Sequence, residues 1–113
     1  MLIYNSRNLQ KLYIAFFGRP CDPSGLKYWL SKLNQKMEIK DVAKALSIQN
    51  EYKNNLITYF SIESQVNQLY LNLYGRKADF ESLNYWIFSI KQGKFQIYDL
   101  VYHLITPNLN ENQ

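Results

Sequence analysis

Apolar residues recur along this chain with the period of an α-helix. In the first 17 residues they stand at positions i, i+3, i+4, i+7 and i+8, namely at Leu9, Leu12, Tyr13, Phe16 and Phe17. This spacing puts them on one face of a helix. Asn5 or Ser6 is suited to cap its start. Gly18 is suited to end it, because glycine takes the left-handed backbone conformation at little cost.

Two more amphipathic segments follow. Asp22 is suited as the N-cap of a second helix and Pro23 as its first residue, because proline lacks only an N–H that would be unpaired there. The apolar positions of this helix are Leu26, Trp29, Leu30 and Leu33, and those of a third helix are Ile39, Val42, Ala43 and Leu46. We also expect a short helix within residues 50–56, where several asparagines weaken helix propensity.

The same order of elements then returns. Ser61 is suited to cap a fourth long helix that ends at Gly75, and Asp79 to cap a fifth that ends near Gly93. The apolar positions of these two helices and of a sixth are Val66, Leu69, Tyr70, Leu73 and Tyr74, then Leu83, Trp86, Ile87 and Ile90, then Ile97, Leu100, Val101 and Leu104.

This order returns because the sequence is duplicated. Residues 12–29 recur as residues 69–86 at a constant offset of 57, without a gap. The identical pairs are Leu12/Leu69, Tyr13/Tyr70, Gly18/Gly75, Arg19/Arg76, Asp22/Asp79, Leu26/Leu83, Tyr28/Tyr85 and Trp29/Trp86. The third-helix pattern recurs at an offset of 58, so one residue has been inserted between the two.

The duplication predicts an all-α fold. We expect a helical bundle of two pseudo-symmetric three-helix repeats, with about six main helices and a short connecting helix. A unit of about 50 residues buries too little surface to be stable alone, so the two copies should share one core. We predict a single domain over residues 1–106, with repeat one at 5–57, repeat two at 61–106, and a polar tail or linker at 107–113.

Composition agrees with a folded helical protein and adds an uneven charge. Of the 113 residues 47% are hydrophobic, and the net charge is +4. Residues 1–60 hold nine Lys and Arg against four Asp and Glu, whereas residues 61–113 hold four against five. An anionic partner is one interpretation. The lysines are spread over several helices, which is more typical of a solvated surface, so we expect no nucleic-acid partner.

The chain offers little for catalysis or metal binding. Cys21 is the only cysteine and His103 the only histidine, so neither an internal disulfide nor a zinc site can be assembled. Exposure of Cys21 beside Arg19 would lower the pKa of its thiol. A nucleophile motif, a phosphate-binding loop and a carboxylate pair are all missing. We predict no catalytic residues, no metal, no cofactor in this domain and no enzyme activity.

Targeting signals are equally sparse. The first 20 residues lack the unbroken apolar segment of a secretory signal, and no stretch approaches the ~20 apolar residues of a membrane span. We expect no transmembrane segment. If the protein is exported, we expect a route that needs no cleaved N-terminal signal.

One polar constellation occurs in both copies, as Gly18-Arg19/Asp22 and Gly75-Arg76/Asp79. In a structural interpretation the arginine reaches the carbonyls at the end of the first helix or the capping carboxylate, and the aspartate caps the next helix. In a ligand interpretation the same side chains bind sugar hydroxyls together with Tyr28 and Tyr85. Both interpretations stay open at this stage.

The tryptophans allow two interpretations as well. Trp29 and Trp86 lie on apolar stripes, which favours packing in the core, while an exposed platform for stacking a sugar is the alternative. Tyr28 and Tyr85 flank those stripes, so we expect them to be partly exposed and available to a partner.

The duplicated motif Leu-Tyr-x-x-x-x-Gly-Arg-x-x-Asp-x-x-x-Leu-x-Tyr-Trp resembles a small helical repeat family known as a domain of unknown function. The resemblance covers about residues 9–56 and 66–104. The first copy is nearly ideal, whereas the second has Lys77, Phe80 and Ser82 where the first has Pro20, Pro23 and Gly25. Such domains often occur in exported bacterial proteins, including surface-layer proteins and calcium-binding repeat proteins, and are similar to phycobilisome linker domains.

The resemblance implies a non-enzymatic N-terminal anchoring module of an exported surface protein. Such a module would bind cell-surface polysaccharide, such as the O-antigen of lipopolysaccharide, in a groove between the two units. The expected contacts are Arg19, Asp22, Lys27 and Tyr28, with Arg76, Asp79 and Tyr85 from the second copy. Self-association in a lattice and calcium bound by a continuation of the chain are further expectations. The alternatives are a protein–protein scaffold and a cytoplasmic location.

Overall fold

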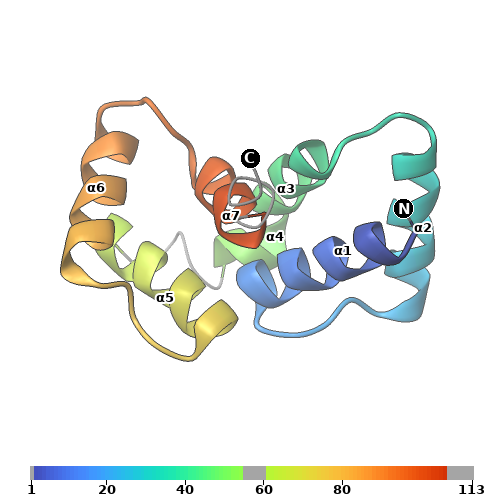
Figure 1. Ribbon diagram of the computed structural model, residues 1–113, viewed down its shortest axis with the longest axis horizontal. Coiled ribbons are helices and arrows are strands. Elements are labelled where there is room, and N and C mark those ends of the chain that lie inside the picture. Colours follow the sequence, from blue (N-terminus) through green and yellow to red (C-terminus); the bar gives the residue numbers. More distant parts are fainter. Residues whose placement is uncertain (1, 55–60, 107–113) are drawn as a thin grey trace.

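The part of the chain that the computed structural model describes, residues 2–54 and 61–106, is built of α-helices and contains no strand (Figure 1). The helices are α1 (Leu2–Phe17), α2 (Pro23–Asn34), α3 (Ile39–Ser47), α4 (Asn50–Tyr52), α5 (Ile62–Tyr74), α6 (Phe80–Lys91) and α7 (Ile97–Ile105). The predicted all-α bundle of six main helices and one short helix is confirmed.

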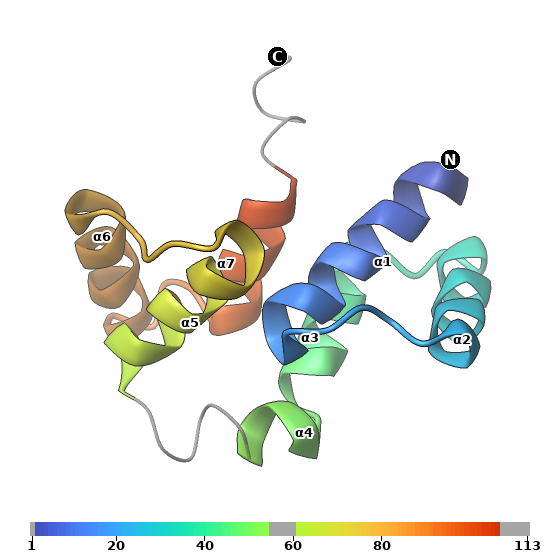
Figure 2. The same cartoon turned by 90° about the horizontal axis from the view of Figure 1, so that it is seen from below.

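The two repeats face each other across the middle of the molecule. The first helices of the repeats, α1 and α5, pack together, and so do the third helices, α3 and α7. The second helices lie at opposite flanks, α2 packed on α1 and α6 packed on α5 (Figures 1 and 2). Four helices therefore form the centre, and α2 and α6 project from it in opposite directions.

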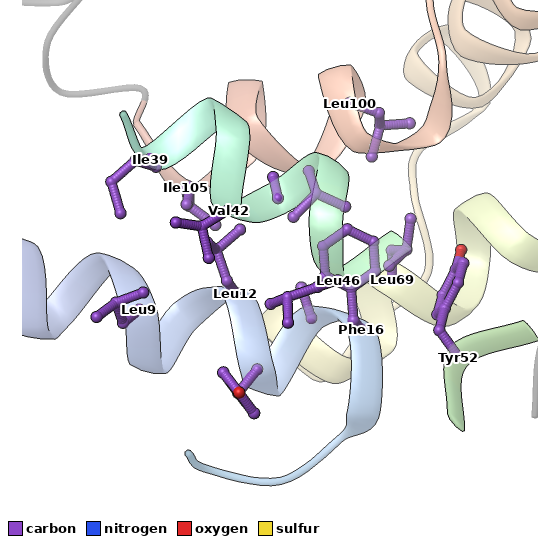
Figure 3. Close-up of a cluster of buried hydrophobic side chains, with 14 of the residues drawn as sticks. Leu9, Leu12, Phe16, Ile39, Val42, Leu46, Tyr52, Leu69, Leu100 and Ile105 are labelled. Carbon is purple, nitrogen blue, oxygen red and sulfur yellow. The ribbon is translucent and has the colours of Figure 1, made fainter. Parts of the chain in front are cut away.

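The core belongs to both repeats, as the small size of each unit predicts. Leu12 and Phe16 on α1, Leu46 on α3 and Leu100 on α7 are all fully or almost fully buried and lie close together (Figure 3). Phe16 also meets the ring of Tyr52 on α4 edge to face, with ring centroids 5.0 Å apart. Because α1 packs against α2, α3, α4, α5 and α7, it is the helix on which the rest of the fold depends.

The flanking helices bury much less of their apolar faces. On α2 only Trp29 is buried, and the leucines of its stripe are half-buried. On α6 only Trp86 and Ser89 are buried. The apolar period correctly predicts which face of each helix points inward. The period does not tell how deeply that face is buried, because burial depends on how many neighbouring helices cover it.

Helix ends follow local chemistry with one exception. Asp22, Ser61 and Asp79 are N-caps, and Gly18 and Gly75 follow their helices with φ of +71° and +73°, as predicted. The predicted start of the first helix at residues 5–6 is wrong, because α1 begins at Leu2. An N-cap residue is favourable at a helix start but does not compel one, and extending an existing helix is easy.

Two predictions fall wholly or partly outside the described residues. The connecting helix was expected within residues 50–56, and α4 occupies Asn50–Tyr52 at the start of that range. The expected end of repeat one at residue 57 and the polar tail at 107–113 lie outside the described part of the chain.

Candidate functional site

The two copies of the repeated turn begin next to each other. The side-chain amide of Asn72 donates a hydrogen bond of 2.9 Å to the backbone oxygen of Ala15, and these two residues are 57 positions apart, so they are equivalent in the two repeats. The segments that lead to α2 and α6 then diverge on one face of the molecule (Figure 2). The predicted ligand residues are thereby divided between two flanks.

Arg19 is held by a partner that the sequence did not indicate. Its Nε and Nη2 donate to Glu51 on α4 at 3.2 and 2.9 Å, and its Nη1 donates to the carbonyl oxygen of Pro20 at 3.2 Å. The guanidinium also lies 5.7 Å from the ring of Tyr13 and 5.5 Å from that of Phe17. Hydrogen bonding to Glu51 raises the pKa of Arg19. Arg19 therefore ties the turn to α4 rather than to Asp22 or to the last carbonyls of α1.

Arg76 has no such anchor. It is exposed and makes no hydrogen bond or ion pair with the described residues. The position equivalent to Glu51 at the third-helix offset of 58 is Leu109, which cannot pair with an arginine. The duplicated arginines thus occupy equivalent places with different surroundings.

Asp22 and Asp79 are committed to capping. Asp22 Oδ2 accepts hydrogen bonds from Ser24 Oγ at 2.6 Å and from the backbone N–H of Gly25 at 3.2 Å. The carboxylate of Asp79 accepts from the backbone N–H of Ser82 at 2.8 Å and from its Oγ at 3.2 Å. These hydrogen bonds lower the pKa of both carboxyl groups. The structural interpretation accounts for every one of these contacts.

Trp29 and Trp86 are buried, with 8% and 6% of their surface exposed, so neither is a sugar platform. The indole Nε1 of Trp29 donates a hydrogen bond of 3.0 Å to the hydroxyl of Tyr13. In the second repeat, burial raises the pKa of Tyr70 while hydrogen bonding by Trp86 opposes the shift. In the first repeat the Trp29–Tyr13 hydrogen bond therefore fastens the second helix to the first.

Cys21 is a small residue of the loop before α2, and it is buried. Burial raises the pKa of its thiol, so the lower pKa that exposure beside Arg19 would cause does not arise. The sulfur fills space beside Gly25, where an added Cβ would lie 3.3 Å from Cys21 Sγ, 3.3 Å from Tyr13 Oη and 3.1 Å from Asp22 Oδ1. In the second repeat Ala78 replaces Cys21 and Ser82 replaces Gly25. The smaller alanine therefore occurs together with the larger serine.

Two amide side chains outside the repeated motif brace the turns. Gln10 Oε1 accepts a hydrogen bond from the backbone N–H of Cys21 at 2.7 Å, and Asn67 Oδ1 accepts one from that of Ala78 at 3.2 Å. Gln10 and Asn67 are also 57 positions apart. An amide at the same position of both copies, two residues before the motif, was the signal that could have revealed them.

Helix α2 has two surface features, an exposed tyrosine beside Lys32 and an open cavity that neither of these residues lines. Tyr28 is 54% exposed, its ring lies edge to face with Trp29 at a centroid distance of 4.9 Å, and Lys32 Nζ is 5.4 Å from the Tyr28 ring centroid. The nearby cavity has a volume of about 570 Å³ and is lined by Pro23, Leu26, Lys27, Leu30, Ser31, Asn34 and Gln35. Lys27 and Tyr28 are the two predicted ligand residues that remain available on this flank.

The opposite flank is more apolar. On α6, Tyr85 is 50% exposed, and two phenylalanines are more exposed still, Phe80 at 80% and Phe88 at 65%. The equivalent residues of α2 are Pro23 and Ser31, so this aromatic surface exists in the second repeat alone. The two flanks therefore present different chemistry to a partner.

A cavity also lies between the repeats, but the predicted ligand residues do not line it. It has a volume of about 250 Å³ and is lined by Lys44, Ser47, Ile48, Tyr52, Lys53, Gln96, Ile97 and Tyr98. Arg19, Asp22, Lys27 and Tyr28, which were expected in a groove between the units, therefore do not line this cavity.

Within residues 2–54 and 61–106 no group of three or more His, Cys, Asp or Glu side chains is placed to hold a metal ion. His103 is exposed, and its ring lies edge to face with Trp86 at 5.6 Å. No helix in the described ranges is both long enough and apolar enough to cross a membrane.

Fold and surfaces together define a small helical domain made of two repeats. Residues 3–56 match a protein family described as "Domain of unknown function (DUF4214)", so the match coincides with the first repeat. Comparison with curated proteins finds no match. Comparison with solved structures finds none either.

Proposed function

We propose that this protein is a non-enzymatic binding module that attaches an exported protein to cell-surface polysaccharide, such as the O-antigen of lipopolysaccharide. The observation that carries this proposal is the surface of α2. There Tyr28 is half exposed with Lys32 near its ring, and Lys27 lines an open cavity on the same helix. An aromatic ring offers a flat apolar surface for a sugar ring, and the lysines are donors for hydroxyl and acidic groups.

The contacts differ from those that the motif suggested. Arg19 and Asp22 already form hydrogen bonds within the protein. The proposed contacts on α2 are therefore Lys27, Tyr28 and Lys32. The excess of Lys and Arg over Asp and Glu in residues 1–60 favours an anionic glycan at this flank. Arg76, Asp79 and Tyr85 belong to a separate surface around α6.

The experiment is a binding measurement on purified lipopolysaccharide with and without its O-polysaccharide. We expect the wild-type protein to bind only the complete form, and the double variant Lys27→Gln/Tyr28→Ala to lose that binding. Lys91→Gln/Tyr85→Ala is the matched control, because it removes the same charge and the equivalent tyrosine on α6. Absence of binding to either form, or equal loss in both variants, contradicts the proposal.

A protein–protein scaffold is the second candidate, and the exposed phenylalanines of α6 favour it. Phenylalanine has no polar group, so exposing Phe80 and Phe88 on the same helix as Tyr85 is typical of a surface that an apolar partner covers. If the protein is a scaffold, the double variant Phe80→Ser/Phe88→Ser should lose binding to its partner protein. The double variant Lys27→Gln/Tyr28→Ala should keep that binding. The polysaccharide function predicts the reverse dependence.

The proposed function requires the protein at the cell surface, and the cytoplasm is the alternative. Antibody labelling of intact and permeabilised cells distinguishes the two locations. Labelling of intact cells supports anchoring, and labelling only after permeabilisation contradicts it.

A further inference from the structure

The open cavity on α2 follows one face of that helix. Its described lining residues lie within residues 23–35, at the spacing of a single helix face. Leu26 and Leu30 are half-buried there, and Lys27 and Ser31 are exposed. At about 1.5 Å per residue, the cavity follows roughly 18 Å of helix. It is therefore long enough to take side chains from another helix.

The equivalent face of α6 carries large side chains in place of small ones. At the repeat offset of 57, Phe80 replaces Pro23 and Phe88 replaces Ser31. These two rings are 80% and 65% exposed. They are eight positions apart, or about 12 Å along the helix axis, which is shorter than the α2 cavity. The cavity volume of about 570 Å³ falls within the ~300–1,000 Å³ of sites for drug-sized molecules, so it has room for these rings.

The two faces lie at opposite flanks of the molecule, so within one copy they do not meet (Figures 1 and 2). Between two copies they can. If α6 of one copy contacts α2 of another, each copy in the pair still has one unused face. A contact between two different surfaces of the same protein therefore continues from copy to copy, and it forms rows or rings instead of closed dimers.

Charge favours contact between the unlike flanks. Helix α2 carries Lys27 and Lys32 and no acidic residue, whereas on α6 Glu81 offsets Lys91. Nine Lys and Arg against four Asp and Glu give residues 1–60 a net charge of +5, and four against five give residues 61–113 a net charge of −1. Contact between two α2 helices would oppose like charges, and contact between α2 and α6 does not.

We propose that α6 of one copy docks on α2 of a second copy of this chain, with Phe80 and Phe88 placed in the α2 cavity. Each phenylalanine buries ~150–250 Å², so the two together supply less than the ~800 Å² per partner of a standard interface. A single contact is therefore weak, and association depends on protein concentration. Tyr28 and Lys32 lie outside the cavity, so the proposal does not rest on polysaccharide binding.

The experiment is analytical ultracentrifugation of the full chain without any glycan, from micromolar to millimolar concentration. We expect the average mass of the wild-type protein to rise beyond that of two chains. Phe80→Ser/Phe88→Ser removes the inserted rings, and Ser31→Arg places a long charged side chain in the cavity. Each variant should raise the dissociation constant by about tenfold or more. The three positions are exposed, so both variants should keep the wild-type circular dichroism spectrum.

Two matched controls test whether the effect is local. Ile48→Ser/Leu71→Ser removes two exposed apolar side chains that lie on neither α2 nor α6. Gln49→Arg adds the same side chain as Ser31→Arg at an exposed position between α3 and α4. Both controls should associate as the wild-type protein does.

Mixing the two test variants identifies which faces meet. The chain with Phe80→Ser/Phe88→Ser keeps its α2 cavity, and the chain with Ser31→Arg keeps its α6 rings. An equimolar mixture should therefore form a dimer that grows no further, although each variant alone stays at the mass of one chain.

Four results overturn the proposal. The first is a wild-type protein that keeps the mass of one chain at millimolar concentration. The second is equal weakening in the test variants and their controls. The third is a mixture in which both test variants remain monomeric. The fourth is dimerisation of Ser31→Arg alone, which would show that α6 pairs with α6.

Discussion

The Tyr13 hydroxyl joins several groups of the repeated motif in the first copy. It accepts the indole hydrogen bond of Trp29 at 3.0 Å and lies close to Cys21 and Gly25. The motif residues therefore depend on one another, which explains why tyrosine and tryptophan recur together in both copies.

Replacing Tyr13 with phenylalanine tests this role. Tyr13→Phe keeps the ring and removes the acceptor, which leaves the buried Trp29 N–H without a partner. We expect the free energy of unfolding to fall by about 1–3 kcal/mol, as measured by urea denaturation. Tyr28→Phe is the control, because the Tyr28 side chain is half exposed, and it should leave stability unchanged. Equal effects of the two changes would contradict the assigned hydrogen bond.

The pair Cys21 and Gly25 permits a second test. Gly25→Ser alone should destabilise the protein, because the new Cβ would meet Cys21 Sγ and Tyr13 Oη at 3.3 Å. Cys21→Ala/Gly25→Ser recreates the combination of the second repeat and should recover much of the loss, with a coupling energy of about 0.5–3 kcal/mol. A double-mutant cycle of urea unfolding measures this coupling. Strict additivity of the two changes would show that the sulfur does not limit residue 25.

Each second helix depends on its aspartate cap, whose titration makes stability depend on pH. The pKa values of Asp22 and Asp79 are lowered in the folded protein by hydrogen bonds from the first turn of the helix. Their contribution is thus fully present above the ordinary pKa of about 3.9. It is lost as the pH falls through the lowered folded values.

The double variant Asp22→Asn/Asp79→Asn separates capping from charge. Asparagine caps as well as aspartate but does not titrate. We expect the variant to lose less stability than the wild-type protein between pH 5 and pH 2, as followed by the urea midpoint. Parallel curves for the two proteins would mean that these carboxylates do not govern the acid sensitivity.

Some properties of helices α2 and α6 follow from the local sequence pattern and others do not. Their existence, caps and inward faces were predicted correctly, because these depend on residues within a few positions of one another. Their half-buried leucines and exposed phenylalanines were not predicted, since α2 packs on α1 and α6 on α5 without a second large neighbour. This incomplete cover leaves the α2 cavity and the Phe80/Phe88 surface open to solvent.

Both repeats contribute to one core, so neither should be stable alone. A fragment of residues 1–57 would expose Leu12 and Leu46, which α5 and α7 help to cover in the whole protein. We expect this fragment to lose most of its helical signal in far-UV circular dichroism, and the full chain to unfold in one cooperative transition. A fragment that keeps its helicity and melts cooperatively would show that the repeat is an independent domain.

The candidate site illustrates the same division. The aspartate caps could be predicted, because a cap bonds to backbone groups only a few residues away. The burial of Trp29 and Trp86 could be predicted from the apolar period. The partner of Arg19 could not, because Glu51 is 32 residues away and belongs to a helix of three residues with little pattern of its own. The separation of Tyr28 from Tyr85 was also hidden, because identical motifs give no orientation of one copy relative to the other.

By itself the sequence determined the all-helical fold, the duplication, the helix ends marked by Gly18, Asp22, Gly75 and Asp79, and the need for a shared core. These properties follow from local geometry and from the amount of apolar surface that a short chain must bury. Only the tertiary structure decided that α2 and α6 project to opposite flanks, that Arg19 pairs with Glu51, and that α3, α4 and α7 line a cavity between the repeats. Those properties arise from contacts between distant residues, which depend on how helices pack and not on the pattern within any one of them.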